Sequence, residues 1–336
     1  GMGNNITIYG EFIDADVEVY VVTYVNSNNE VDTPSAENVK STEAANFKPA
    51  DLGKITNDDT SKSKYFLGWY IDEACKTLFN GALTGSVTLY AGWDNKAELS
   101  IVIPNSTHIL EAGVPTGKYY YKGQSVVIPD ISTHPQISAM YTVPEGYKFI
   151  GFLATAGCTT TLEHATDSSG YITGITTKVT VSNDLSKGLT ITADIRKILK
   201  VDITMTASAK HKYGKDYTAT FNIDKVTLTN GSYYSTDKYN WKQSDNSSIY
   251  SGKKFTIYIL SGENKTQSDT QVTVSINDIK DLGLWPSTAD FYATESALTV
   301  TNCIKTTATH NDNSSTFTFT ITDDSAQISW YGEKVK

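Results

Sequence analysis

Apolar and polar residues alternate along the chain in short runs, of which 19–25, 255–259 and 317–321 are the clearest. An alternating run places every second side chain on one face, as in a β-strand that buries one face and exposes the other. Clusters of Gly, Asn, Asp and Ser separate the runs and supply turns. Only 35–45 is compatible with a helical turn or two, so the pattern predicts an all-β or mainly β fold.

Some of these runs recur in a fixed order, which indicates an internal repeat. The segments 6–12, 87–93 and, more weakly, 189–195 share one pattern of aliphatic residue, Thr, aliphatic residue, small residue and a bulky apolar end. Eight residues after the end of each segment, the chain is again in an alternating run. The spacing therefore predicts successive units of one kind.

A second pair of blocks has a matching arrangement. The blocks are Tyr-Phe-Leu-Gly-Trp-Tyr at 65–70 and Tyr-Lys-Phe-Ile-Gly-Phe at 147–152, and in both a cysteine lies seven residues after the glycine. A shift of one residue would turn the core face outward, so a shared order of blocks requires a shared topology. We expect Trp69 to superpose on Phe152 and the extra residues 166–187 to form a hairpin or loop beyond the common core.

The first of these blocks also resembles a known family. The sequence Tyr-Phe-Leu-Gly-Trp-Tyr-Ile-Asp-Glu-Ala-Cys (65–75), followed by Val-Thr-Leu-Tyr-Ala-Gly-Trp (87–93), is similar to the Listeria–Bacteroides repeat, also called the internalin B-repeat. The resemblance covers 17–96 well. It covers 97–197 in a divergent form, in which Gly-Phe-Leu replaces Gly-Trp-Tyr and the Tyr-Ala-x-Trp ending is missing. It does not extend to 198–336, which has no Gly-Trp-Tyr block.

The resemblance implies a row of small β-grasp-like units in a long secreted or surface-attached bacterial protein. Such units act as spacers, stalks and adhesion modules, and the family has no catalytic residues to carry over. Its signature residues are structural, in keeping with a small unit that needs large rings to bury enough area. The matching residues of this chain are Gly68, Trp69, Tyr70, Tyr90 and Trp93 and, in the divergent copy, Gly151 and Phe152.

These observations divide the chain into four parts. Residues 1–16 are interpreted as a cloning remnant followed by the last strand of a truncated upstream repeat. The segments 17–96 and 97–197 are interpreted as repeat domains. The remainder, 198–336, has about seven candidate strands with turns at regular intervals, which is typical of a β-sandwich.

The connections between these parts are short. The segments 13–16, 94–97 and 196–199 contain no Gly/Ser run that would act as a flexible tether. Units joined in this way are expected to form a semi-rigid row in which each touches mainly its neighbours. The sequence therefore predicts an elongated molecule with small interdomain contacts and no deep cleft between domains.

The charge of the chain argues against nucleic acid as a partner. The formal net charge is −9, the isoelectric point is near 5.1, and Arg196 is the only arginine. An acidic chain without arginine forks suits neither a nucleic-acid interface nor a phosphate clamp. No apolar run approaches the roughly 20 residues that span a bilayer. The family resemblance implies an extracellular location at the bacterial cell surface.

Residues with reactive side chains are scattered. None of the three cysteines has the basic surroundings and histidine partner of a nucleophilic thiol, and the five histidines form no zinc pattern. Acidic loops at 14–18, 57–59 and 311–313 offer oxygen ligands for calcium but lack the EF-hand spacing, so solvent-facing turns are the simpler interpretation. We expect no enzyme activity, no catalytic residue, no metal ion and no cofactor. The cysteines, interpreted as small buried apolar residues, are Cys75, Cys158 and Cys303.

One segment suggests ligand binding. Tyr233, Tyr234, Tyr239 and Trp241 lie close together in the sequence beside amides and carboxylates. Sugars bind to such sets because their CH groups stack on rings and their hydroxyls bond to polar groups. If the segment is extended, Tyr239 and Trp241 share a face. The alternative is that the rings pack in the sandwich or cap it, as in other aromatic-rich strands.

Two functions follow from the sequence. The first is a non-catalytic stalk or adhesion module whose partner is a host or cell-envelope protein or glycan of unknown identity. The alternative is a glycan- or ligand-binding module in the C-terminal domain.

Overall fold

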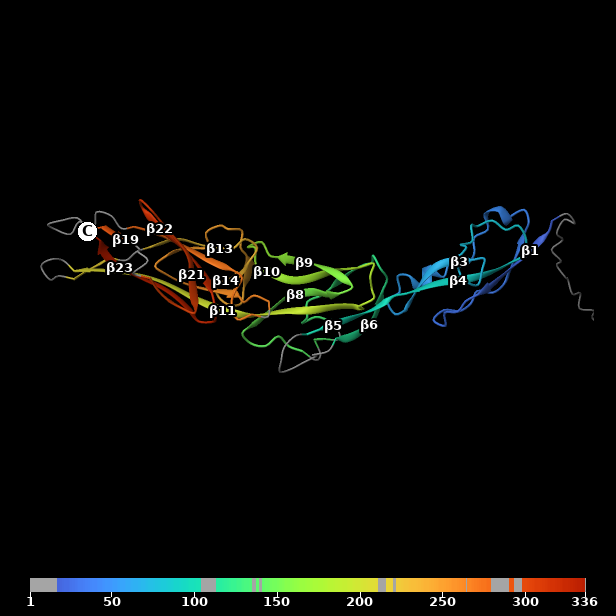
Figure 1. Ribbon diagram of the computed structural model, residues 1–336, viewed down its shortest axis with the longest axis horizontal. Helices are drawn as coiled ribbons and strands as arrows, with labels where there is room; N and C mark the ends of the chain where they lie inside the picture. The colour runs from blue at the N-terminus through green and yellow to red at the C-terminus, as the bar shows by residue number, and fades with distance from the viewer. Residues whose placement is uncertain are drawn as a thin grey trace, which may run out of the picture.

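The computed structural model describes residues 17–103, 113–134, 137–138, 141–210, 216–219, 222–263, 265–278, 290–292 and 298–335. Within them the chain is mainly β and forms several sheets, with a one-turn α-helix, α1 (Gly53–Thr56), and a 3-10 turn, η1 (Ala44–Asn46). No helix in this part of the chain is long and apolar enough to cross a membrane. Figure 1 shows an elongated molecule whose units follow one another from the blue end to the red end. The strand predicted at 6–12 lies outside the described residues.

The first unit, residues 17–95, is a four-stranded sheet in the order β2-β1-β4-β3. β1 (Val19–Val25) pairs in parallel with β4 (Val87–Asn95). β2 (Glu37–Lys40) pairs antiparallel with β1, and β3 (Lys64–Tyr70) pairs antiparallel with β4. The apolar residues that alternate along these strands share a core with those of the intervening loops, including Val22, Tyr24, Val39, Phe47, Leu52, Phe66, Trp69 and Leu89.

The second unit, residues 97–197, contains a sheet in the order β6-β5-β11-β8. β5 (Ala97–Val102) pairs in parallel with the first half of β11 (Leu189–Lys210). β6 (Val114–Tyr120) pairs antiparallel with β5, and β8 (Tyr147–Ala156) pairs antiparallel with β11. The order and the strand directions are therefore those of the first sheet.

A three-stranded sheet, β7-β10-β9, completes the second unit. β9 (Cys158–Thr166) and β10 (Ile172–Val181) form a hairpin, and β7 (Ser125–Ile128) pairs with the other edge of β10. The residues predicted to lie beyond the core include β10, but Val179 and Val181 of this strand are fully buried in it. Residues 166–187 thus include the turn and second strand of a hairpin, as expected, but they do not lie outside the core of this unit, because alternate residues of β10 are buried in it.

β11 belongs to two units. Its first half pairs with β5 and β8, and its second half pairs with strands of the third unit. The segment 196–199, predicted to be a linker, lies inside this 22-residue strand. The spacing that suggested a linker therefore falls within one continuous strand, whose charged residues make the side-chain contacts described below.

The connection at 94–97 is also packed. β4 ends at Asn95 and β5 begins at Ala97, and the intervening Lys96 is buried, with its Nζ 2.6 Å from the carbonyl oxygen of Thr56. Across this junction the ring of Tyr65 stacks on that of Tyr121, with 3.7 Å between centroids. The expectation of small interdomain contacts is therefore wrong at this junction.

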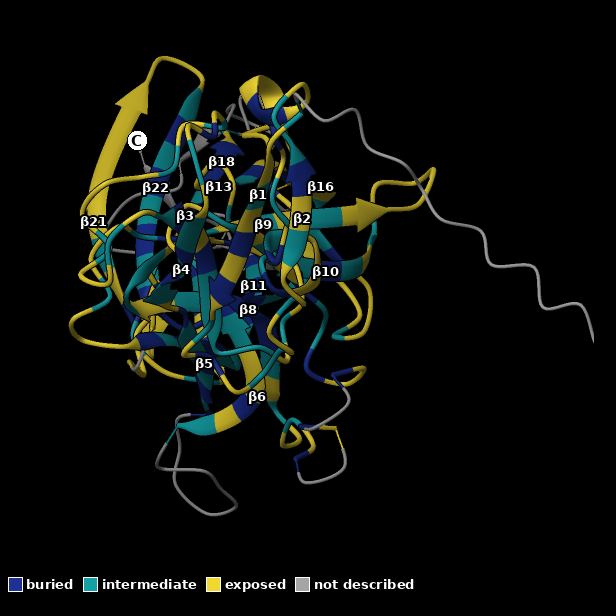
Figure 2. Cartoon of the chain, turned by 90° about the vertical axis from the view of Figure 1, so that its right-hand side faces the viewer, coloured by how far each residue is buried: buried dark blue, intermediate teal, exposed yellow. Residues whose placement is uncertain are grey.

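The third unit consists of two sheets. One runs β15-β14-β17-β11-β23-β19 and also pairs with β12 and β20, and the other runs β16-β13-β18-β22-β21. Both contribute to one apolar core, in which Ile203 and Trp330 meet Phe319. Figure 2 shows β21 as an exposed strand, in keeping with its position at a sheet edge. The bounds are β12 (Asp216–Ala219), β13 (Ile223–Leu228), β14 (Tyr233–Ser235), β15 (Trp241–Gln243), β16 (Tyr250–Gly252), β17 (Lys254–Leu260), β18 (Gln271–Asn277), β19 (Asp290–Tyr292), β20 (Leu298–Thr301), β21 (Cys303–Asn311), β22 (Ser314–Ile321) and β23 (Ala326–Val335).

One relation recurs in all three units. The strand by which the chain enters a unit pairs in parallel with the strand by which it leaves. These pairs are β1 with β4, β5 with β11, and β11 with β23.

Candidate functional site

The aromatic segment of the third unit lies where this unit meets the second. β14 and β15 form a short hairpin joined by residues 236–240. Asp237 organises the turn, because its Oδ1 accepts hydrogen bonds from the backbone N–H groups of Asn240 (2.7 Å) and Tyr239 (2.8 Å). These bonds, led by those from Asn240, hold the pKa of Asp237 well below its ordinary value. Lys238 has a φ of 77°, which L-residues rarely adopt.

Trp241 fills the junction between the two units. Its side chain is only 2% exposed, and its Nε1 donates a hydrogen bond to the carbonyl oxygen of Lys238 at 3.0 Å. Its ring therefore has no free face on which a sugar could stack. The apolar residues clustered with it come from both units: Ile150 of β8, Ile175 of β10 and Leu260 of β17.

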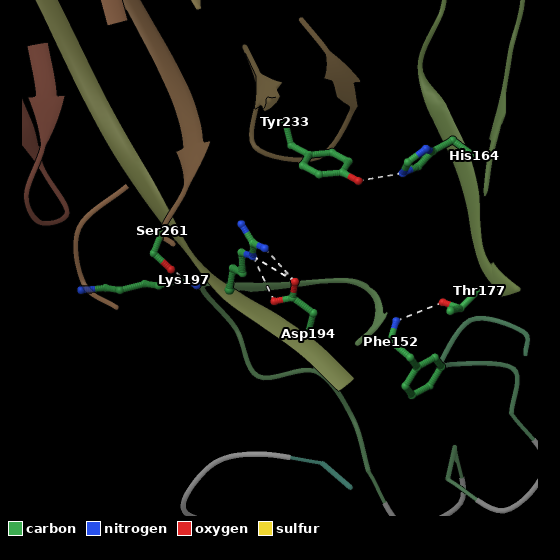
Figure 3. A network of polar contacts seen from close by, with 8 residues as sticks. Phe152, His164, Thr177, Asp194, Lys197, Tyr233 and Ser261 are labelled. Carbon is green, nitrogen blue, oxygen red and sulfur yellow. Dashed lines mark hydrogen bonds and ion pairs between the residues drawn. The ribbon is translucent and has the colours of Figure 1, made fainter. Parts of the chain in front are cut away.

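Tyr233 connects the same two units through a polar contact. Its hydroxyl lies 2.8 Å from Nε2 of His164 in β9, and the two rings meet edge to face (Figure 3). Burial raises the pKa of Tyr233 and lowers the pKa of His164. Tyr234 pairs with Ile259 and packs against the core of the third unit. Three of the four proposed ligand residues are thus packing residues.

Charged side chains on β11 hold the strand at the junction. Asp194 is buried and accepts three hydrogen bonds from Arg196, two from Nε at 2.9 and 3.2 Å and one from Nη2 at 2.8 Å. Lys197 donates its backbone N–H to Oγ of Ser261 at 3.1 Å (Figure 3), and its Nζ pairs with Asp323 at 3.0 Å. The contacts of Trp241, Tyr233 and this strand make the second junction extensive, contrary to the sequence-based expectation.

Tyr239 differs from its neighbours because its side chain is 80% exposed. The condition for a shared face with Trp241 is not met, because Tyr239 lies in the turn between β14 and β15 and not in an extended segment. A groove of about 400 Å³ opens beside Tyr239, lined by residues of both units. Its lining includes the aromatic residues Tyr147, Tyr239 and Trp241 and the charged residues Asp130, Glu145, Lys148 and Lys238.

The predicted structural residues of the first repeat lie on both faces of its sheet. Trp69 is buried, and its Nε1 donates a hydrogen bond to the carbonyl oxygen of Ala50 at 2.6 Å. Trp93 packs against the same core in a partly buried position. Tyr70 is paired with Tyr90 across β3 and β4, and both are partly exposed rather than in the core.

The two glycines of the repeat blocks have nearly the same backbone conformation, with φ of 129° at Gly68 and 128° at Gly151. A Cβ at Gly68 would lie 2.9 Å from Leu78, and one at Gly151 would overlap Leu162. Both positions therefore require glycine for conformation and for space. Phe152, which follows Gly151, is buried in the core of the second unit.

The reactive residues are separate from the groove. Burial raises the pKa of the Cys303 thiol to about 11 and also raises the pKa of Cys75 and Cys158, both only partly buried. Among the described residues, no three His, Cys, Asp or Glu side chains come together as metal ligands. In the acidic loop at 57–59, Asp59 Oδ1 accepts the N–H and the hydroxyl of Ser61.

Comparisons of the chain with protein-family models, with curated proteins and with solved structures found no match.

Proposed function

We propose that this chain is a non-catalytic, load-bearing stalk or adhesion module of a bacterial secreted or cell-surface protein. The observation that carries the proposal is the parallel pairing of the entering strand with the leaving strand in all three units. The elongated arrangement of the units (Figure 1) places these pairs in series.

A parallel pair of this kind resists tension along the chain. Pulling on both ends draws the entering strand backward and the leaving strand forward, so their hydrogen bonds are loaded together in shear. An antiparallel hairpin pulled at its two ends instead opens one bond after another. Seven residue pairs connect β11 to β23, and four connect each of the other two pairs. The third unit should therefore be the strongest.

The first two units are proposed to be copies of one β-grasp-like repeat of the Listeria–Bacteroides kind. Equal strand orders and directions support this, and so do the matched registers at the glycine blocks. In the first unit Trp69 pairs with Ala91 and Phe66 with Trp93. In the second unit Phe152 pairs with Ala193 and Phe149 with Ile195.

The proposal places the chain outside the cell, where it holds a neighbouring domain away from the surface. Its partner would be a host or cell-envelope protein or glycan. Packed junctions support this role, because a flexible joint would let the row collapse. An antibody against the chain should label intact cells of the bacterium that produces it, and labelling only after lysis would contradict the location.

Single-molecule force spectroscopy tests the load-bearing role. In one measurement the chain is held by handles at its two ends. In the other it is held at its start and at Asp312, in the turn between β21 and β22. The force at which the third unit unfolds is compared between the two. We expect a higher force for the first attachment, because only that one loads β11 against β23 in shear. Equal forces would refute the proposal.

A further inference from the structure

Tyr239 presents an exposed ring on a rigid support. Its exposed fraction of 80% is the highest among the large apolar side chains in the described part of the chain. The turn that carries it is held by Asp237, which accepts three hydrogen bonds at Oδ1. The neighbouring Lys238 keeps an unfavourable positive φ, a kind of strain that concentrates at ligand-binding positions. A ring fixed in this way loses little conformational freedom when it binds a ligand.

The groove beside this ring has the size and position of a small-molecule site. Its volume of about 400 Å³ lies within the range of roughly 300–1,000 Å³ usual for such sites, which often form between domains. Tyr147, at the start of β8, contributes a second exposed ring from the second unit. Trp241 also borders the groove, but its side chain is buried and offers no ring face to a ligand.

The charges of the groove favour an uncharged ligand. Asp130 and Glu145 are balanced by Lys148 and Lys238, so an anion or a cation meets one repelling group for every attracting one. Lys238 and Glu145 form only a loose pair at 3.8 Å, and the Glu145 side chain is almost fully exposed. A hydroxyl group can donate a hydrogen bond to a carboxylate and accept one from an ammonium group, so a polyhydroxylated ligand uses both kinds of residue.

From this geometry we infer that the groove between the second and third units binds a neutral saccharide of one or two sugar rings, with Tyr239 as the stacking platform. The inference specifies a glycan among the partners that the proposed adhesive function allows and rests on that part of it, whereas the load-bearing role needs no such site and is tested separately. The sugar lies with a CH face on Tyr239, and its hydroxyls contact the carboxylates and ammonium groups of the lining.

Saturation-transfer NMR on the full chain tests the inference. The probes are cellobiose, maltose, lactose and N,N′-diacetylchitobiose, each at about 10 mM, so that even millimolar affinity is detected. We expect transfer to at least one of them. Tyr239→Ala should weaken that binding by about tenfold, because ring stacking is lost, whereas Tyr239→Phe should keep it within about threefold. Tyr119→Ala, which changes a partly exposed tyrosine outside the groove, should leave it unchanged.

Three results would overturn the inference. One is the absence of transfer to all four disaccharides. Another is binding that survives Tyr239→Ala at full strength, which would place the sugar elsewhere. The third is tighter binding of the anionic sialyllactose than of lactose, which would contradict the charge argument.

Discussion

Replacing Trp241 with alanine should loosen the packing between the second unit and the third. The side chain is 2% exposed, so nearly all of the roughly 150–250 Å² that a large aromatic residue buries is lost. At about 25 cal/mol per Å² this corresponds to about 4–6 kcal/mol, and measured aromatic-to-alanine changes in cores cost about 3–5 kcal/mol. We therefore expect the free energy of unfolding to fall by about 4 kcal/mol. The partners that lose contact are Ile150, Ile175 and Leu260.

Urea denaturation followed by circular dichroism measures this loss, and solution scattering measures the effect on shape. With the apolar contact gone, the two units are joined mainly through β11, so the distribution of maximum dimensions should broaden. Tyr239→Ala is the matched control, since an exposed side chain in the same hairpin should change stability by less than about 0.5 kcal/mol. Trp241→Phe gives an intermediate value if the alanine variant does not fold. A loss below about 1 kcal/mol for Trp241→Ala would refute the reasoning.

Two further predictions concern the second unit. Gly151→Ala should destabilise the protein by more than about 1 kcal/mol, and by more than Gly68→Ala does. The reason is that a Cβ at Gly151 overlaps Leu162, whereas the exposed Leu78 near Gly68 can move. Thermal denaturation that ranks Gly68→Ala as the more harmful change would contradict this. Burial lowers the pKa of His164, so the unfolded chain binds more protons than the folded chain; this contribution to stability, present above the ordinary pKa of 6.5, is lost as the pH falls below 6.5 through the lowered folded-state pKa. Denaturation at pH 7 and pH 5 should therefore show a smaller loss for His164→Gln than for the unchanged chain, and equal losses would count against the assignment.

Strands with one buried face could be predicted from alternation, whereas others could not. The runs 255–259 and 317–321 became β17 and β22, each with alternate residues in the core. β21 shows no such alternation, because it is an edge strand whose side chains are mostly exposed and no apolar residue marks every second position. β14 and β15 have three residues each and α1 has four, which is too short for any periodicity to show.

The groove was only partly predictable. The aromatic cluster at 233–241 is evident in the sequence. The turn held by Asp237 is not, and with that turn in place Trp241 is buried whereas Tyr239 is exposed to solvent. Asp130, Glu145 and Lys148 come from a different unit, and nothing in a single sequence signals so distant a contact. The repeated spacing suggested a linker at 196–199, whereas the partners of Arg196 and Lys197, Asp194 and Asp323, become evident only in the folded chain.

The shared strand β11 also sets the order in which the chain can fold during synthesis. The first unit has all its strands once residue 95 has been made, whereas the second cannot close before the first half of β11. The third unit cannot close until β23, the last strand described, has been made, because β23 pairs with the second half of β11. Until then that half offers an open edge to other chains. Chains that stop before β23 should therefore associate through β11, and rapid completion of β23 protects the chain from aggregation.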